Sequence, residues 1–393
     1  MTPEHARETA LATIDQSADR LIEVSRKMHA EVELAFDEYK AQGLLCDVMD
    51  EAGLEVTHGL GTLQTAFRGT GGQKQAGPSI AFLCEYDGLP VYGQSCGHNV
   101  AAAASLGAGL GFASVVDALG GRCIIMGTPG EEGGGGKHIL CSEGWFDDLD
   151  AMMLIYPGMD NIAHSRAVGA TRVEISYHGK AAHAAARPEL GINALDALLL
   201  ALNGVSALRQ QLPSDVRVHY IITKGGTLPQ VIPDHVTAVL TLRANDPATV
   251  RAVKPRIDAC LEGAARMTGA RLDRQWSPSV GQPLLSNAAM AGRFDGALRG
   301  LGRETRGRDE LSGAWSGDTN AVSWKVPTIQ PQIAMTGRDV PPHSHEFHAA
   351  SVGPAAEACI LDAAKAMALT AIDLVTDPTL MPAVRAEFEA ARG

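Results

Sequence analysis

The fold is most constrained by an alternation of short buried strands and helices in the first half of the chain. Apolar runs typical of buried strands occur at 80–84, 123–126 and 151–155, and an Ala- and Gly-rich helical segment occupies 99–118. Polar residues follow each strand. This alternation is typical of an open α/β sheet, in which ligands bind outside the carboxyl ends of the strands. We therefore expect an α/β domain with a functional site at that edge.

A second pattern begins near residue 170. The expected elements are strands at 171–177, 217–222 and 237–243 and helices at 193–211 and 247–268. Such a run of about 105 residues is typical of a self-contained α+β unit with an antiparallel sheet.

The N-terminal and C-terminal parts of the chain are expected to form one domain together. We expect residues 4–53 to be helical, and after about 276 the chain returns to Gly-rich loops, a strand at 328–331 and a helix at 351–374. The predicted architecture has two parts. Residues 1–169 and 276–393 form a catalytic, aminopeptidase-like α/β domain with a mixed sheet and flanking helices. Residues 170–275 form a smaller inserted α+β domain.

Composition excludes several classes of partner. The chain has 393 residues, 45% of them hydrophobic, and a formal net charge of −12. Nucleic acids and anionic membranes bind clustered Lys and Arg, so we expect neither as a partner. The apolar stretch at 99–118 is long enough for a membrane span, but its small residues favour a buried helix. Seven scattered cysteines and a polar N-terminus without an apparent targeting segment predict reduced thiols in a cytoplasmic protein.

Two short motifs carry the chemistry. Cys96 and His98 stand two residues apart in a loop before a helix, and the adjacent Glu131 and Glu132 lie in the Gly-rich turn at 127–137. The thiolate and the imidazole can reach one metal ion, although a core cysteine beside a capped histidine is the alternative. Of two neighbouring carboxylates, one can bind the metal and the other can take a proton from metal-activated water. We assign Glu132 to the metal, and Glu131 to general base and then general acid.

Further side chains complete this interpretation. His343 is the expected distal ligand, whereas His345 and His348 belong to a solvated cluster. Asp87, at the end of a strand, is expected to fix an imidazole tautomer by a hydrogen bond. The alternative for Asp87 is a purely structural role.

The inserted domain contributes two candidates. His183 lies among very small residues at 179–185 and could polarise a carbonyl or hold a tetrahedral oxyanion. Arg243, at the end of a strand, could clamp a carboxylate with two hydrogen bonds. Each could equally be structural when considered alone.

Six motifs occur together in the order found in one known family. They are Glu85-Tyr86-Asp87-Gly88-Leu89-Pro90, Cys96-Gly97-His98-Asn99, Gly127-Thr128-Pro129-Gly130-Glu131-Glu132, Gly179 to Ala185, Val231-Ile232-Pro233-Asp234 and His343-Ser344-His345-Glu346-Phe347. Over nearly the whole chain they resemble the aminoacylase and carboxypeptidase G family of metallohydrolases, and most closely its p-aminobenzoyl-glutamate hydrolase branch. The resemblance implies a two-metal catalytic domain, an inserted lid domain that also dimerises, and hydrolysis of amide bonds.

The resemblance also implies roles by position. Cys96 would bridge two metal ions. Glu132 and His343 would complete one site, and His98 would serve the other. Glu131 would be the base.

The chain departs from the family pattern at two places. The family's further ligand follows the strand at 151–155, where this chain has Tyr156-Pro157. A neutral phenol is a poor ligand for Zn²⁺ or Mn²⁺ because its pKa near 10 must be overcome. His164 is a candidate substitute, and Gln230 replaces the family's usual Asn. We expect Tyr156, His164, Gln230 and Arg243 to line the substrate site.

We therefore predict a metal-dependent hydrolase that cleaves the C–N amide bond of a small N-acyl or N-aroyl amino acid or dipeptide-like substrate. One ion of Mn, Zn or Co would be held tightly by Cys96, Glu132 and His343, with a second site weak or absent. A homodimer or higher homo-oligomer is expected. The resemblance implies that His183 stabilises the transition state, often in the site of a partner subunit.

Three alternatives remain. The chain could be an aryl-amine hydrolase similar to 5-nitroanthranilate aminohydrolase, which releases ammonia from an aromatic substrate. It could be an inactive homologue that binds a ligand. It could also use Cys96 as a nucleophile with His98, although side chains two residues apart rarely align for proton transfer.

Overall fold

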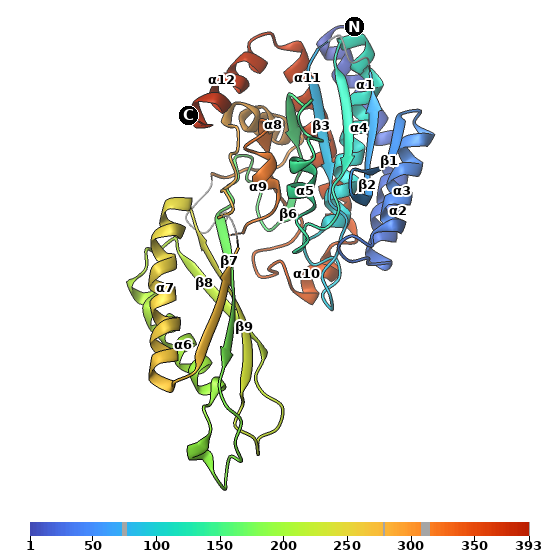
Figure 1. Cartoon of the computed structure of the whole chain (residues 1–393). Helices are drawn as coiled ribbons and strands as arrows, with labels where there is room; N and C mark the ends of the chain where they lie inside the picture. The colour runs from blue at the N-terminus through green and yellow to red at the C-terminus, as the bar shows by residue number, and fades with distance from the viewer. Residues whose placement is uncertain (73–76, 278–279, 308–314, 393) are drawn as a thin grey trace. The chain divides into compact units, whose positions relative to one another are not determined.

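The computed structural model describes residues 1–72, 77–277, 280–307 and 315–392, which form two compact units (Figure 1). The first unit contains Met1–Arg166 and the described residues from Leu284 onward, apart from Trp315 and Ser316. The second unit contains Ala167–Pro283 together with those two residues. The predicted inserted domain, residues 170–275, falls within the second unit.

A six-stranded mixed sheet organises the first unit, in the order β1-β2-β4-β3-β5-β11. The strands are β1 Glu55–Leu60, β2 Leu63–Gly71, β3 Ser79–Cys84, β4 Arg122–Gly127, β5 Ala151–Met153 and β11 Thr328–Ile329. Strands β4, β3, β5 and β11 are parallel, whereas β2 is antiparallel to β4 and to β1. The carboxyl ends of the parallel strands therefore meet at one edge. The predicted mixed α/β fold is confirmed.

Strands β3 and β4 lie in the middle of the sheet and are buried on both faces, as expected for parallel strands covered by helices. Alternate β3 residues enter two different cores: Phe82 joins the larger cluster and Leu83 the smaller one. Cys84 pairs with Gly127, and Thr128 donates to the Cys84 carbonyl at 2.9 Å. The two loops that follow these strands therefore start side by side.

Helices cover both faces of this sheet. They are α1 Pro3–Gln16, α2 Ala18–Ala30, α3 Tyr39–Glu51, α4 His98–Leu119, α5 Gly136–Ser142, α8 Ala288–Gly300, α9 Thr319–Val322, α10 His345–Ala350, α11 Pro354–Thr376 and α12 Leu380–Arg392. Residues of α1–α4, α8 and α11 form the larger core, and residues of α5 and α9 form part of the smaller one. Among the described helices, α4 alone is long and apolar enough to cross a membrane. It packs against α1, α2, α11 and the sheet, and 89% of its apolar window is buried, as in a core helix.

The second unit is an antiparallel sheet in the order β10-β7-β9-β8. Its elements are β7 Gly169–His178, η1 Pro188–Leu190, α6 Ala194–Leu208, η2 Arg209–Gln211, β8 Arg217–Lys224, β9 His235–Ala244, α7 Pro247–Thr268 and β10 Arg271–Trp276. Buried and half-buried residues alternate along β9, and the buried set packs with α6 and α7 in a separate hydrophobic core. This alternation is the period-2 pattern of a sheet with one covered face.

Several expected elements differ from the observed ones. Residues 4–53, expected to be helical, form three helices, which are interrupted at Ser17 and over 31–38. The expected strand at 151–155 is shorter than predicted, since β5 ends at Met153. A separate short strand, β6 (Tyr156–Gly158), follows it and pairs with β12 (Gln332–Ala334) outside the main sheet. Strands β1, β2 and β10 and helix α12 were not expected.

Candidate metal centre

A sharp turn before α4 brings Cys96 and His98 to one side of the chain. Gly97 between them caps the helix with φ 73°, in the left-handed region that glycine adopts most easily. A Cβ at this position would lie 2.9 Å from the Cβ of Pro157, so a larger residue would also clash. The turn therefore requires glycine, and it directs the thiol and the imidazole toward the loop after β4.

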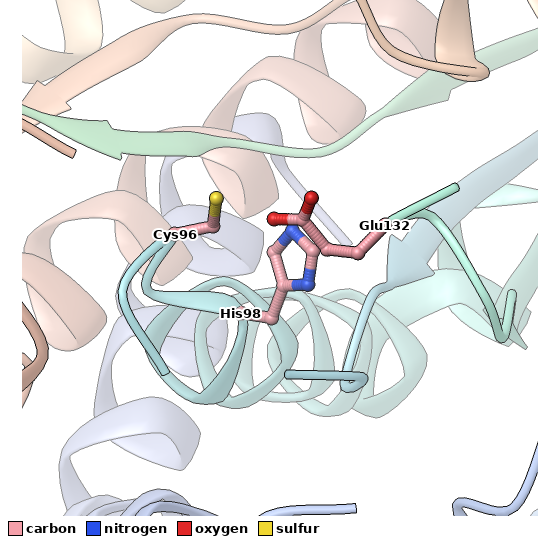
Figure 2. Close-up of side chains that lie close together, drawn as sticks. All are labelled: Cys96, His98 and Glu132. Atoms are coloured by element: carbon pink, nitrogen blue, oxygen red, sulfur yellow. The ribbon is translucent and has the colours of Figure 1, made fainter. Parts of the chain in front are cut away.

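Glu132, in the loop after β4, completes a group of three potential metal ligands with Cys96 and His98 (Figure 2). Their ligand atoms all lie within 4.8 Å of one another, and it is the only such group found among the described residues. Cys96 and His98 are buried and Glu132 is half-buried. Sulfur, nitrogen and carboxylate oxygen are the donors that Zn²⁺ prefers in proteins.

Asp87 connects the imidazole with the acidic loop. Nδ1 of His98 lies 2.8 Å from the Asp87 carbonyl oxygen and 3.3 Å from its Oδ1. The carbonyl oxygen can only accept a hydrogen bond, so Nδ1 carries a proton and Nε2 is the ring nitrogen left to bind a metal. The other carboxylate oxygen of Asp87 accepts from the Glu132 backbone N–H at 2.8 Å. Asp87 thus orients His98 and also fixes the backbone of the loop that carries Glu132.

The observed side chains fit a divalent cation. Oε1 of Glu132 is buried and has no hydrogen-bond partner, which is unusual for a buried carboxylate oxygen. Burial, followed by the negative charge of Glu132, raises the pKa of the Cys96 thiol well above its ordinary value. A bound cation offsets both effects, because a coordinating thiol is deprotonated outright.

Glu131 lies beside this group without joining it. Its Oε2 is 3.8 Å from Nε2 of His98, and only 17% of its side chain is exposed. Burial, and then the charges of Glu85 and Asp318, raise the pKa of Glu131 well above its ordinary value. Glu131 is therefore held beside the ligand group, and a divalent ion bound there would offset the negative charges that favour its protonated form.

His343 approaches Glu132 from the segment before α10. Its Nε2 is 3.8 Å from Glu132 Oε1, and 59% of its side chain is exposed. Its backbone has φ 64°, a conformation uncommon outside glycine, and its N–H donates to the Ser95 carbonyl at 3.0 Å. The structure groups His98 rather than His343 with Cys96 and Glu132, so the ligand role of His343 remains a prediction.

Tyr156 and His164 have different surroundings. Burial, and then the charges of Cys96, Glu131 and Glu132, raise the pKa of Tyr156 well above its ordinary value. The next residue, Pro157, packs against Gly97, so the start of β6 lies beside the turn that carries Cys96 and His98. Nε2 of His164 lies 3.2 Å from the Ser286 carbonyl oxygen. His164 is not part of the ligand group found among the described residues, so its role as a substitute ligand or in substrate binding remains a prediction.

The other three predicted residues lie in the second unit. His183 is exposed in the loop after β7, and its Nδ1 accepts from the N–H groups of Ala185 and Ala186 at 3.2 and 3.1 Å. The Gln230 carbonyl accepts from the Ala184 N–H at 2.9 Å, so the two loops are bonded together. Arg243 lies on β9, where its charge adds to the effect of burial in lowering the pKa of His219 on β8. Their roles in catalysis and substrate binding remain predictions.

Three buried charges beside the centre had no role in the sequence interpretation. The Nζ atom of Lys137 lies 2.7 Å from Glu85 Oε1 and 2.7 Å from Asp318 Oδ1. The other oxygen of Glu85 is 3.7 Å from Nε2 of His98. Glu85 follows a buried strand and Lys137 ends the Gly-rich turn, so both positions carried a signal. Lys137 and Asp318 are far apart in the sequence, so their ion pair could not be predicted from it.

Known proteins resemble the chain along nearly its whole length. A family model described as a peptidase dimerisation domain matches residues 166–267. The chain is 35% identical to the Xaa-Arg dipeptidase of Mus musculus, over 98% of this chain and 93% of that protein. It is 27% identical to a subunit of the p-aminobenzoyl-glutamate hydrolase of Escherichia coli, over 96% and 93% of the two chains.

One solved structure, a Bacillus subtilis protein described as a dinuclear metal binding peptidase from the M20 family, superposes with a TM-score of 0.68 at 19% identity. The match covers 92% of this chain and 99% of that one. At this level of identity the likeness establishes the fold.

Proposed function

The chain belongs to the M20 peptidase family, whose members hydrolyse amide bonds of dipeptides and N-acyl amino acids, and on that premise we propose that it is a metal-dependent dipeptidase for substrates with a basic C-terminal residue. Family membership confirms the predicted family and the predicted reaction class, hydrolysis of a C–N bond. The substrate preference is supported by the relatives above 30% identity, which are described as Xaa-Arg dipeptidases.

The group formed by Cys96, His98 and Glu132 is the observation that carries the catalytic part of the proposal. These residues would hold a divalent ion of Zn, Mn or Co, and His343 is the candidate to join them through Glu132. When bound, the ion supplies a positive charge that polarises the scissile carbonyl and lowers the pKa of water. We propose one tightly held ion, because Tyr156 stands where a second ion would need a ligand.

Glu131 is the proposed general base. Its carboxylate is next to the ligand group but is not one of the three clustered ligands, so it is available to the attacking water. It would take a proton from that water and return it to the leaving amine nitrogen. A single carboxylate can perform both transfers because the second proton acceptor forms only after the C–N bond begins to break.

The second unit supplies the proposed remaining functions. The model that matches residues 166–267 supports a homodimer formed through this unit. His183 would stabilise the transition state, and Arg243 would bind the substrate carboxylate, with Gln230 near the loop that carries His183. A cytoplasmic location agrees with the seven free cysteines.

A substrate panel tests the proposal. Protein stripped with a chelator and reloaded with Mn²⁺, Zn²⁺ or Co²⁺ would be assayed on Ala-Arg, Ala-Lys, Ala-Glu, N-acetyl-Arg and p-aminobenzoyl-glutamate. We expect metal-dependent release of Arg and Lys with the highest kcat/KM for the basic dipeptides. A preference for p-aminobenzoyl-glutamate would overturn the substrate assignment. Ammonia release from 5-nitroanthranilate without peptide hydrolysis would instead favour the aryl-amine reaction, for which the supporting observation is the aromatic residue Tyr156 next to Pro157, which packs against Gly97 in the ligand turn.

A further inference from the structure

A fully buried ammonium group lies behind the metal centre. Lys137, at the start of α5, has no exposed surface, and Glu85 and Asp318 are 2% and 5% exposed. Asp318 accepts twice from the same residue, from the Lys137 backbone N–H at 2.9 Å and from Nζ at 2.7 Å. Burying an unpaired charge is very costly, so the ammonium is held in place by these two carboxylates.

Glu85 faces the metal centre with its other oxygen. Its Oε1 contacts Lys137 and its Oε2 lies 3.7 Å from His98 Nε2. Oε2 of Glu131 approaches the same nitrogen to 3.8 Å. Two carboxylates therefore converge on the imidazole nitrogen that would bind metal, and they provide the oxygen donors that a second divalent ion requires.

Lys137 changes what this pair of carboxylates can do. Its charge is already shared between Glu85 and Asp318, at hydrogen-bond distance from both. A second divalent ion at Glu85 would have to compete with a buried ammonium at close range, where charges interact strongly because little water separates them.

We propose that Lys137 is the built-in cation of this centre, and that by occupying Glu85 and Asp318 it limits the centre to a single divalent ion. The inference rests on the proposed function only in taking Cys96, His98 and Glu132 as metal ligands. Lys137 is thus a positioning residue, which acts on the metal centre through Glu85.

Metal stoichiometry tests this role. Wild type, Lys137→Met and Lys137→Gln would be equilibrated with buffered Zn²⁺ or Mn²⁺, and the ions bound per chain would be measured by plasma mass spectrometry. We expect one ion in wild type. In both variants we expect a second ion, or at least a tenfold gain in second-ion affinity, because Glu85 loses its cation. If Lys137→Met does not fold, the same measurement is made on Lys137→Gln, whose uncharged amide can donate hydrogen bonds to both carboxylates.

Lys137→Met combined with Glu85→Gln is the matched control. Removing the carboxylate together with its cation should return the centre to one ion, so the gain is assigned to Glu85. Lower thermal stability in both Lys137 variants with unchanged second-ion affinity would overturn the inference and leave Lys137 with a structural role. Two tightly held ions in wild type would also overturn it.

The two proposals fail separately in these measurements. If wild-type protein binds no ion, both the proposed metal centre and the proposed function are overturned. Wild-type protein that binds one ion but hydrolyses none of the panel substrates overturns the proposed activity alone, because stoichiometry is measured without substrate.

Discussion

Glu131 and Glu132 are neighbours in the chain, but their side chains have different surroundings. Glu132 belongs to the group of three ligands, and its backbone N–H is held by Asp87. Glu131 is not one of the three, and its Oε2 lies 3.8 Å from Nε2 of His98. Adjacent residues in an irregular loop can therefore divide metal binding and proton transfer between them.

Replacing Glu131 separates these two tasks. Glu131→Gln keeps the size of the side chain and removes its ability to take a proton. We expect kcat on a basic dipeptide to fall by about 10²–10⁴-fold, the usual contribution of general base catalysis, with metal content unchanged. Glu132→Gln is the matched control and should lower metal content itself. Full turnover by the Glu131 variant would remove this residue from its proposed role.

Local spacing explains which site residues the sequence could reveal. Cys96 and Glu132 lie in the loops after the neighbouring strands β3 and β4, and His98 begins the helix that follows the first loop, so their meeting follows from strand order. The contact between Lys137 and Asp318 joins residues 181 positions apart and depends on how α5 and α9 pack. No periodicity or motif spacing carries that information.

Helix α4 shows how small residues position the centre. Its first residue is His98, and the helix fits between α1, α11 and the sheet only because glycines face its neighbours. A Cβ on Gly109 would lie 2.3 Å from Cγ1 of Ile125 in β4. Gly43 in α3, by contrast, has no heavy atom within 4 Å of the corresponding point.

The same substitution at these two glycines should have opposite effects. Gly109→Ala overpacks the core, and we expect a loss of about 1–3 kcal/mol in the free energy of unfolding. Gly43→Ala lies in a helix interior with free space, and we expect a gain of about 0.5–1 kcal/mol. Urea denaturation of both variants measures their free energies of unfolding. The dependence of that free energy on urea concentration should be the same in both, so that the shift in midpoint reports stability alone. A gain in stability from Gly109→Ala would show that α4 does not need its close approach to β4.

Elements with a strong apolar pattern were predicted well, whereas strand β10, which is rich in charged residues, was not. The helix expected at 99–118 is observed as His98–Leu119, because nearly every residue in it is buried. Strand β10 was missed because it lies at the edge of its sheet and is rich in charged residues. Its pairing with β7 supplies the stability that its own sequence does not indicate.

At the scale of the whole molecule, two hydrophobic cores belong to two separate units. Periodicity identifies a change of pattern near residue 170 but not the other limit of the second unit. Ser277 and Gly281 join that unit through single backbone bonds to Arg172 and Ala170, at 2.8 Å each. Such bonds leave no trace in hydrophobic spacing.

Metal removal should therefore destabilise one unit selectively. All three clustered ligands lie in the first unit, so an ion that binds only the folded state stabilises that unit, by about 2.7 kcal/mol at a free concentration one hundred times its dissociation constant. Hydrogen exchange with and without chelator measures this by segment. We expect faster exchange in β3, β4 and the start of α4, and little change in α6, α7 and β9. In Glu132→Gln, which has already lost a ligand, chelator should have a much smaller effect. Equal loss of protection in both units would instead mean that the ion stabilises the molecule as a single cooperative body.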